Sequence, residues 1–175
     1  MKKLAIVING VGGVGKDTLC DLAARHFKVV NISSVTPVKE LAAIAGWDGR
    51  KDDKSRKFLS DLKRLLADYN DYPTNWALER YHAFLESEND ILFVHIREGS
   101  EIKKFVNATG GAARTLLIRG GERMRRHSNY GNVSDDLVEE YAYDYCYLND
   151  KALNTAEEEF VRLMQKMMDD MPENV

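Results

Sequence analysis

A glycine-rich segment near the amino terminus constrains this chain more than any other feature. Residues 10–18 read Gly-Val-Gly-Gly-Val-Gly-Lys-Asp-Thr, between an apolar run at residues 4–8 and a second apolar pattern that begins at Leu19. This order predicts a buried strand, a turn and the start of a helix. Glycine lets backbone N–H groups face an anion, the helix N-terminus adds partial positive charge, and Lys16 can reach the terminal phosphates. We therefore expect a bound nucleoside triphosphate, contacted by Gly12, Gly13, Val14, Gly15, Lys16, Asp17 and Thr18.

The match to the phosphate-binding pattern G-x-x-x-x-G-K-[ST] has one departure. Gly10, Gly15 and Lys16 fit it, but Asp17 stands at the hydroxyl position and Thr18 follows one residue later. The alternative is a glycine turn that only joins strand to helix, and the spacing, the lysine and the surrounding pattern argue against it. Because a bare carboxylate and a phosphate would repel each other, an acid here indicates a metal ion between them. The candidate ligands are Asp17 and Thr18, and the expected metal is Mg²⁺.

The composition indicates one ordinary domain. A chain of 175 residues with 44% hydrophobic content can bury a core as a single unit, residues 1–175. The net charge of −3 argues against a broadly basic nucleic-acid binder. Cys20 and Cys146 lack a paired spacing and stand in apolar patterns, so we expect reduced core residues in a cytoplasmic protein. No run approaches the about 18 apolar residues that span a membrane, so no membrane contact is expected.

Apolar runs and helical patterns alternate along the chain. The runs predict strands at residues 4–8, 28–32, 91–96, 115–118 and 145–148. The helical patterns cover residues 16–27, 37–45, 54–70, 74–86, 100–107, 134–141 and 155–171. Such alternation predicts an α/β fold, a three-layer sandwich in which helices cover both faces of a five-stranded parallel sheet. Ligands of such sheets bind beyond the carboxyl ends of the strands.

Four segments resemble one enzyme family. The first is Gly15–Thr18, which is specific by itself; the second is Ile32–Glu40, which contains Thr36-Pro37-Val38-Lys39-Glu40. The others are Gly46-Trp47-Asp48-Gly49 with residues 56–62, and Asp144-Tyr145 with Asn149-Asp150. Together they span most of the chain and resemble P-loop kinases of the nucleoside monophosphate kinase group. The resemblance is greatest to phage-type deoxynucleoside monophosphate kinases, and looser to animal phosphomevalonate kinase.

The resemblance implies ATP as donor, Mg²⁺ as cofactor and a P-loop NTPase fold of the nucleoside monophosphate kinase type. It also implies an acceptor-binding insertion at about residues 33–88 and a mobile lid at about residues 119–133. Asn149 and Lys151 would lie on the ATP side. The acceptor would meet Ser33, Lys39, Arg56, Arg64 and Arg97, although a plain surface position is an open alternative for Lys39, Arg56 and Arg64.

In addition to Lys16, we expect arginines to be the catalytic side chains, since a planar guanidinium can bind two phosphate oxygens at once. Arg97 follows the third strand and would contact the acceptor phosphate; the alternative is a surface ion pair with Glu101. Arg123 and Arg126 belong to an arginine cluster that begins at Arg119, beside Gly120 and Gly121, and would close over the phosphates as part of the lid. A solvated basic helix is the alternative for that cluster.

One position departs from the family pattern. The family tends to show Asp-x-Arg-x-x-x-Glu after the third strand, and this chain has His95-Ile96-Arg97-Glu98-Gly99-Ser100-Glu101. The missing aspartate would orient a magnesium-bound water, so Asp17 or Glu98 would have to replace it, or activity would be weak. A histidine at a strand end is also common as a locally hydrogen-bonded structural residue.

We expect an ATP-dependent phosphotransferase that acts on a nucleoside or a (deoxy)nucleoside monophosphate. The alternatives are a kinase of another small phosphorylated metabolite and a non-catalytic ATP-binding regulatory module. A GTPase is disfavoured, because Asn149-Asp150-Lys151 does not have the order Asn-Lys-x-Asp that guanine recognition requires. The expected partner is a small-molecule acceptor, a nucleotide, and not a nucleic acid or a membrane. The oligomeric state stays open.

Overall fold

The five strands form one parallel sheet, as the alternation predicted. The computed structural model describes residues 2–121 and 138–171. The strands are β1 (Leu4–Asn9), β2 (Val29–Ser33), β3 (Ile91–His95), β4 (Arg114–Gly120) and β5 (Tyr145–Asn149). Their order across the sheet is β2-β3-β1-β4-β5, and every neighbouring pair is parallel. All six residues of β1 are buried, so the strand that leads into the glycine-rich loop is the centre of the sheet.

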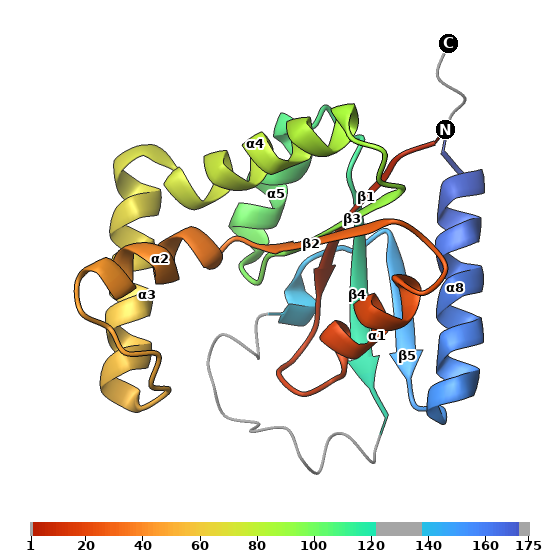
Figure 1. The fold of residues 1–175 in the computed structure, drawn as a ribbon, viewed down its shortest axis with the longest axis horizontal. Coiled ribbons are helices and arrows are strands. Elements are labelled where there is room, and N and C mark those ends of the chain that lie inside the picture. Colours follow the sequence, from red (N-terminus) through yellow and green to blue (C-terminus); the bar gives the residue numbers. More distant parts are fainter. Residues whose placement is uncertain (1, 122–137, 172–175) are drawn as a thin grey trace.

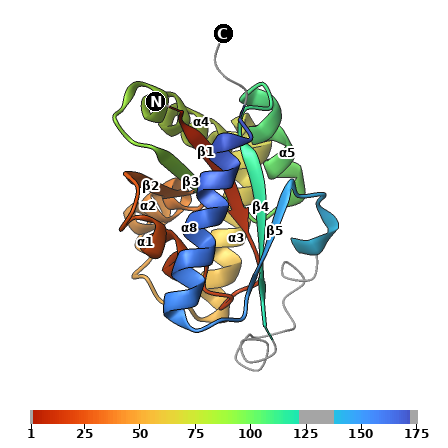
Figure 2. The ribbon, with the colours of Figure 1, turned by 90° about the vertical axis from the view of Figure 1, so that its right-hand side faces the viewer.

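Helices cover both faces of the sheet (Figures 1 and 2). On one face α1 (Lys16–Ala23) and α8 (Leu153–Asp169) pack on Leu4, Ile6 and Ile8. On the other, α4 (Tyr72–Glu86) and α5 (Gly99–Ala108) pack on Ala5 and Val7. Alternate residues of β1 thus pack into two separate hydrophobic cores, because successive side chains of a strand point to opposite faces. The predicted three-layer α/β sandwich is confirmed.

Two further helices extend beyond the β2 edge of the sheet (Figure 1). These are α2 (Thr36–Ile44) and α3 (Asp53–Asn70), which we call the arm, residues 36–70. Helix α3 begins after Asp52, whose side chain accepts a hydrogen bond from Ser55 N at 2.8 Å, an N-terminal cap. No residue of α3 is fully buried, so this helix contributes little to either core.

Some boundaries differ from the sequence prediction. Helix α1 ends at Ala23, four residues before its predicted end. Of the predicted helix 134–141, residues 138–140 form a 3₁₀ turn, η1 (Val138–Glu140), and residues 134–137 lie outside the described residues. Cys20 is buried as expected, but the expectation of a core position for Cys146 is wrong, since this residue is exposed on the edge strand β5.

The first residues of the predicted lid lie in or directly after β4. Arg119 and Gly120 belong to β4, where Gly120 is buried and aligned with Asn149 of β5. A Cβ on Gly121 would lie 2.6 Å from the Asp150 Cβ, so glycine there permits a close approach of two chain segments. Gly120 therefore belongs to the sheet, and Gly121 lets the chain pass close to Asp150.

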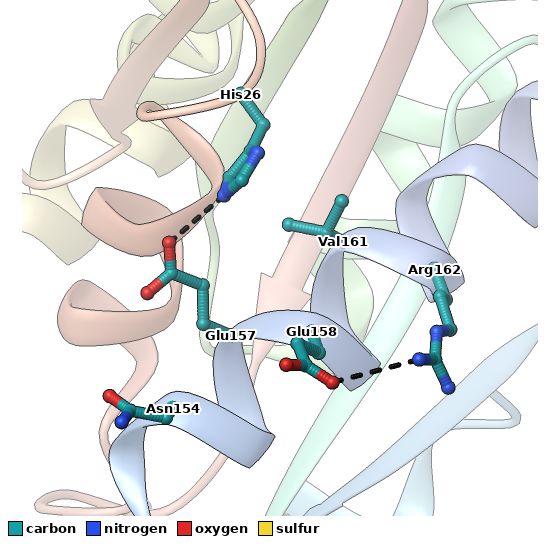
Figure 3. Close-up of a pocket in the computed structure, with 6 residues that line it drawn as sticks. All are labelled: His26, Asn154, Glu157, Glu158, Val161 and Arg162. Atoms are coloured by element: carbon teal, nitrogen blue, oxygen red, sulfur yellow. Dashed lines mark hydrogen bonds and ion pairs between the residues drawn. The ribbon is translucent and has the colours of Figure 1, made fainter.

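Polar contacts join the chain just after α1 to the N-terminal part of α8, beside a shallow pocket (Figure 3). Glu157 accepts a hydrogen bond from Arg25 at 3.0 Å, and one of its oxygens lies 2.9 Å from His26 Nε2. The pocket is lined by His26, Asn154, Glu157, Glu158, Val161 and Arg162, none of which is a predicted site residue.

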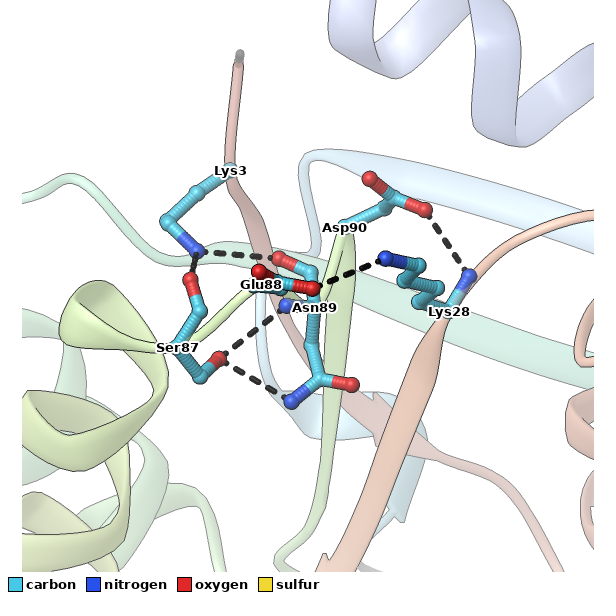
Figure 4. A network of polar contacts seen from close by, with 6 residues as sticks. All are labelled: Lys3, Lys28, Ser87, Glu88, Asn89 and Asp90. Atoms are coloured by element: carbon cyan, nitrogen blue, oxygen red, sulfur yellow. Dashed lines mark hydrogen bonds and ion pairs between the residues drawn. The ribbon is translucent and has the colours of Figure 1, made fainter.

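Polar contacts also hold the amino edge of the sheet (Figure 4). Lys3 Nζ donates to the carbonyl oxygens of Phe84 at 3.2 Å, of Asn89 at 3.0 Å, and of Ser87. Asp90 accepts from the Lys28 backbone N–H at 2.8 Å, at the start of β2. These contacts fix the end of the sheet that lies away from the glycine-rich loop. Within the described residues, no helix has both the length and the apolar character needed to cross a bilayer.

Candidate active site at the carboxyl edge of the sheet

The glycine-rich loop has a backbone that only glycine adopts at low cost. Gly13 and Gly15 have φ angles of +84° and +86°. Gly10 has a φ of +149°, and a Cβ there would lie 2.4 Å from the Ile118 carbonyl oxygen of β4. Gly15 is the N-cap of α1, so the loop passes directly into a helix N-terminus. The loop therefore has the form that presents backbone N–H groups to an anion.

Two buried asparagines hold this loop in place. Asn9 Oδ1 accepts the Gly10 backbone N–H at 2.8 Å, and its Nδ2 donates to the Arg97 carbonyl at 2.9 Å. Asn149, at the end of β5, donates from Nδ2 to the Val14 carbonyl at 2.9 Å. We therefore assign Asn149 to positioning the loop, where the resemblance placed it on the ATP side. Asn9 was missed in the sequence, although a polar residue that ends an apolar strand was the available signal.

Lys16 lies over the loop that precedes it. Its Nζ donates hydrogen bonds to the carbonyl oxygens of Gly10 and, at 3.1 Å, of Val11. The side chain is half-buried. Its ammonium group thus lies at the same loop whose glycines form the candidate anion site, as the motif predicts.

The side chains of Asp17, Cys20 and His95 lie close to one another, beside the first turns of α1. His95 ends β3 and is aligned with Ile8 of β1, one strand away from the loop. Its Nδ1 lies 4.0 Å from Asp17 Oδ1, and its Nε2 lies 3.9 Å from Cys20 Sγ. Burial lowers the pKa of His95, an effect that the Asp17 carboxylate opposes and the Lys16 ammonium adds to. Burial, with Asp17 and Asp21 nearby, raises the pKa of the Cys20 thiol, which is therefore protonated at neutral pH.

Arg97 follows β3 and is half-buried next to a cluster formed by Lys63, Glu98 and Glu101. Lys63 Nζ reaches from α3 to Glu98 Oε2 and to Glu101 Oε2, the latter at 2.8 Å. The Lys63 and Glu101 side chains are only 14% and 13% exposed. Burial favours the protonated carboxyls while Lys63 opposes it, and the result is a lowered pKa for Glu98 and a raised pKa for Glu101. The cluster joins the arm to the chain beside Arg97.

The remaining predicted residues are less closely gathered. Ser33 ends β2 and is aligned with His95, at the same edge of the sheet as the loop. Thr18 and Lys39 are exposed on α1 and α2. On α3, Arg56 and Arg64 make local ion pairs of 3.7 Å with Asp53 and Asp61, and Lys151 lies 3.4 Å from Asp150. Arg123 and Arg126, with most of the predicted lid, lie outside the described residues.

Solved structures with this fold align with nearly the whole chain at low sequence identity. The Deinococcus radiodurans tunicamycin resistance protein is 12% identical, with a TM-score of 0.56, over 94% of this chain and 96% of its own. A putative kinase from Chloroflexus aurantiacus is 12% identical, with a TM-score of 0.51, over 94% and 97% of the two chains. Shikimate kinase from Aquifex aeolicus is 14% identical, with a TM-score of 0.50, over 93% and 96%.

No protein-family model matches the sequence, and no curated protein does either. The structural likeness shows that the chain has the fold of P-loop kinases. This confirms the coarser part of the resemblance found in the sequence, and the acceptor is argued below from the site itself.

Proposed function

We propose that this protein is an ATP-dependent phosphotransferase whose acceptor is a nucleoside or a (deoxy)nucleoside monophosphate. The observation that carries the proposal is the loop of residues 10–15, with its left-handed glycines, its passage into the N-terminus of α1 and Lys16 beside it. A strand, a loop of this form and a helix are the parts that hold the triphosphate in P-loop enzymes. ATP as donor also fits a cytoplasmic location.

The donor side is built from the loop and the first turn of α1. A triphosphate in the loop would accept hydrogen bonds from the backbone N–H groups of the loop. Lys16 would then donate to phosphate oxygens in place of the carbonyl oxygens of Gly10 and Val11. Asp17 and Thr18 are the proposed magnesium ligands. Within residues 2–121 and 138–171, no group of three or more His, Cys, Asp or Glu side chains could hold a metal. Magnesium, which keeps phosphate and water as ligands beside one or two protein oxygens, suits such a site. When bound, it neutralises charge that develops on the transferred group.

The acceptor side is proposed to lie between Arg97 and the arm. Ser33 ends β2 and Arg97 follows β3, at the same edge of the sheet as the loop, so an acceptor held there would face the terminal phosphate of ATP. Arg97 would bind the acceptor phosphate and spread negative charge in the transition state. Lys39, Arg56 and Arg64 stand on the arm and would have to turn toward the acceptor. Arg123 and Arg126 keep their predicted lid role as part of this proposal, and Lys151 its role on the ATP side.

A second acceptor class stays in view. The fold also occurs in shikimate kinase, whose name gives an acceptor other than a nucleotide, so a kinase of another small metabolite is the alternative. His95 favours a further alternative, a module that binds ATP without turning it over. The three possibilities differ in whether ADP is released from ATP, and in which acceptor must be present for this release.

The deciding experiment is an ADP-release screen with Mg²⁺ and ATP against the common nucleosides and their monophosphates. We expect turnover with at least one of them, and we expect Lys16→Ala to reduce it by a factor of about 100 or more, because one lost charge contact in the transition state costs on the order of 3 kcal/mol. Lys166→Ala, an exposed lysine on α8, is the matched control and should keep full turnover. Full turnover in Lys16→Ala would overturn the proposal. Binding of ATP that depends on Lys16, without turnover of any acceptor, would identify the regulatory module instead.

A further inference from the structure

His95 and Asp17 present two different donor atoms to the same space below the loop. Asp17 occupies the position directly after Lys16, where the phosphate-binding pattern has a hydroxyl that contacts the metal. Its side chain is 91% exposed, whereas that of His95 is 17% exposed and held at the end of β3. Nδ1 of His95 is the nitrogen that faces the Asp17 carboxylate, at 4.0 Å.

We propose that His95 and Asp17 jointly bind the divalent cation that accompanies ATP, and that this site therefore prefers Mn²⁺ to Mg²⁺. The inference rests on the proposed function, since the cation arrives with the nucleotide. It assigns a metal-binding role to His95, which stands where the family pattern has an aspartate.

The distance between the two donor atoms suits a shared cation. Ligand atoms that each lie about 2.1 Å from one ion can be at most about 4.2 Å apart. The observed 4.0 Å falls within that limit, and adjacent ligands of an octahedral ion would lie about 3.0 Å apart, so the Asp17 carboxylate would have to move closer to His95. Because the Asp17 side chain is exposed, it can also rotate to complete the geometry, while His95 stays fixed by the sheet.

Cys20 provides the partner that a metal-binding histidine needs. A cation on Nδ1 requires the imidazole proton to be on Nε2, and ligating histidines usually donate that second N–H to a neighbour. Cys20 Sγ lies 3.9 Å from Nε2, within the range of a hydrogen bond to sulfur. With the proton on Nε2, this contact leaves Nδ1 facing Asp17.

The donor set decides the metal preference. Mg²⁺ prefers an octahedral set of oxygens, whereas imidazole favours first-row transition metals. In this chain a carboxylate, Asp17, stands at the hydroxyl position of the motif, and an imidazole, His95, stands at the aspartate position of the family pattern. The pair of protein ligands therefore changes from two oxygens to one oxygen and one nitrogen. Mn²⁺ accepts both types of donor, so we expect it to bind more tightly than Mg²⁺ in the presence of the nucleotide.

The test is pulsed electron paramagnetic resonance of Mn²⁺ with a non-hydrolysable ATP analogue bound to the whole protein. We expect ¹⁴N modulation from a directly bound imidazole in the wild type and in His82→Gln, an exposed histidine on α4 that serves as control. His95→Gln should lose the modulation and weaken Mn²⁺ binding on the order of tenfold, as changes in metal surroundings typically do. His95→Asp should lose the modulation and shift the preference toward Mg²⁺.

Each outcome decides between the two proposals. Analogue and Mn²⁺ that bind without ¹⁴N modulation in the wild type would overturn this inference and leave the proposed function intact. Modulation that survives in His95→Asp would also overturn it. No binding of the analogue with either metal would overturn both. Because the first comparison uses the wild type alone, the inference can be refuted even if the His95 variants do not fold.

Discussion

Single buried polar side chains connect the loops of the candidate site. Asn9 is 3% exposed and makes three hydrogen bonds, to the Gly10 N–H at 2.8 Å, to the Arg97 carbonyl at 2.9 Å and to the Tyr143 hydroxyl at 2.8 Å. A buried amide with all these partners fixes the donor loop and the chain at Arg97 relative to each other. Asn9 thus links the proposed donor and acceptor sides, beside the direct pairing of β1 with β3.

At this same scale, we expect Arg97→Ala to weaken catalysis far more than it weakens ATP binding. Its proposed contact is with the acceptor phosphate, so its loss should cost on the order of 3 kcal/mol, about a hundredfold in kcat/KM. Steady-state kinetics with the acceptor from the screen, together with ATP titration, measure both quantities. Arg162→Ala on α8, an exposed arginine, should match the wild type. An unchanged rate with weaker ATP binding would move Arg97 to the donor side.

At the scale of elements, the two helices of the arm differ, because α2 has buried residues and α3 has none. Helix α3 packs between α2 and α4 without a fully buried residue. Its Lys63 binds Glu98 and Glu101 at the start of α5, directly after Arg97. A half-buried cluster of one cation and two carboxylates therefore fixes the side of the arm that would face the acceptor.

Lys63→Met should destabilise the fold by about 1–2 kcal/mol at pH 7, because it leaves two carboxylates without their cation and Glu98 is still partly solvated. In the variant, burial raises the pKa of both carboxyls above their unfolded values. The loss should therefore be largest at neutral pH and shrink as the pH falls toward 4. Urea unfolding at pH 7 and pH 5 measures this change. Lys57→Met, which removes an exposed pair with Asp61, is the control and should leave the stability nearly unchanged at both pH values. A loss that is equal at pH 7 and pH 5 would show that the carboxylates do not depend on Lys63.

Across the whole molecule, the proposed active site and the Lys3 hydrogen bonds lie at opposite ends of the strands. The carboxyl ends of the strands carry the loop, His95 and Arg97, whereas the amino ends carry the Lys3 contacts (Figure 4). Two apolar cores, one on each face, keep β1 between them. Changes at the amino edge should therefore affect the unfolding free energy without reaching the site.

Lys3→Met is expected to lower stability by about 1–2 kcal/mol, since three carbonyl oxygens lose their donor. For a chain of this length, that corresponds to a fall in Tm of about 2–8 °C. Calorimetry measures the change, and kcat for the acceptor found in the screen should stay within twofold. Lys28→Met, which breaks an exposed pair with Glu88, should alter Tm far less. A large fall in kcat with Tm unchanged would contradict the separation of the two edges.

The sequence alone determined the strand, glycine loop and helix of residues 4–23, and the five-stranded parallel sheet with helices on both faces. Those features follow from local spacing: glycines for positive φ, a lysine after the loop, and apolar runs of strand length. Local spacing does not reveal that Gly121 lies against Asp150, because Asp150 follows β5, a strand far along the chain.

Only the tertiary structure decided how residues far apart in the chain meet around the loop. Asn149 reaches Val14 across 135 positions, Asn9 reaches Arg97 across 88, and Lys63 reaches Glu98 across 35. His95 comes within 4.0 Å of Asp17 because β3 lies beside β1, which no spacing along the chain reveals. Periodicity reports which face a residue occupies, but the order of strands in the sheet determines its neighbours.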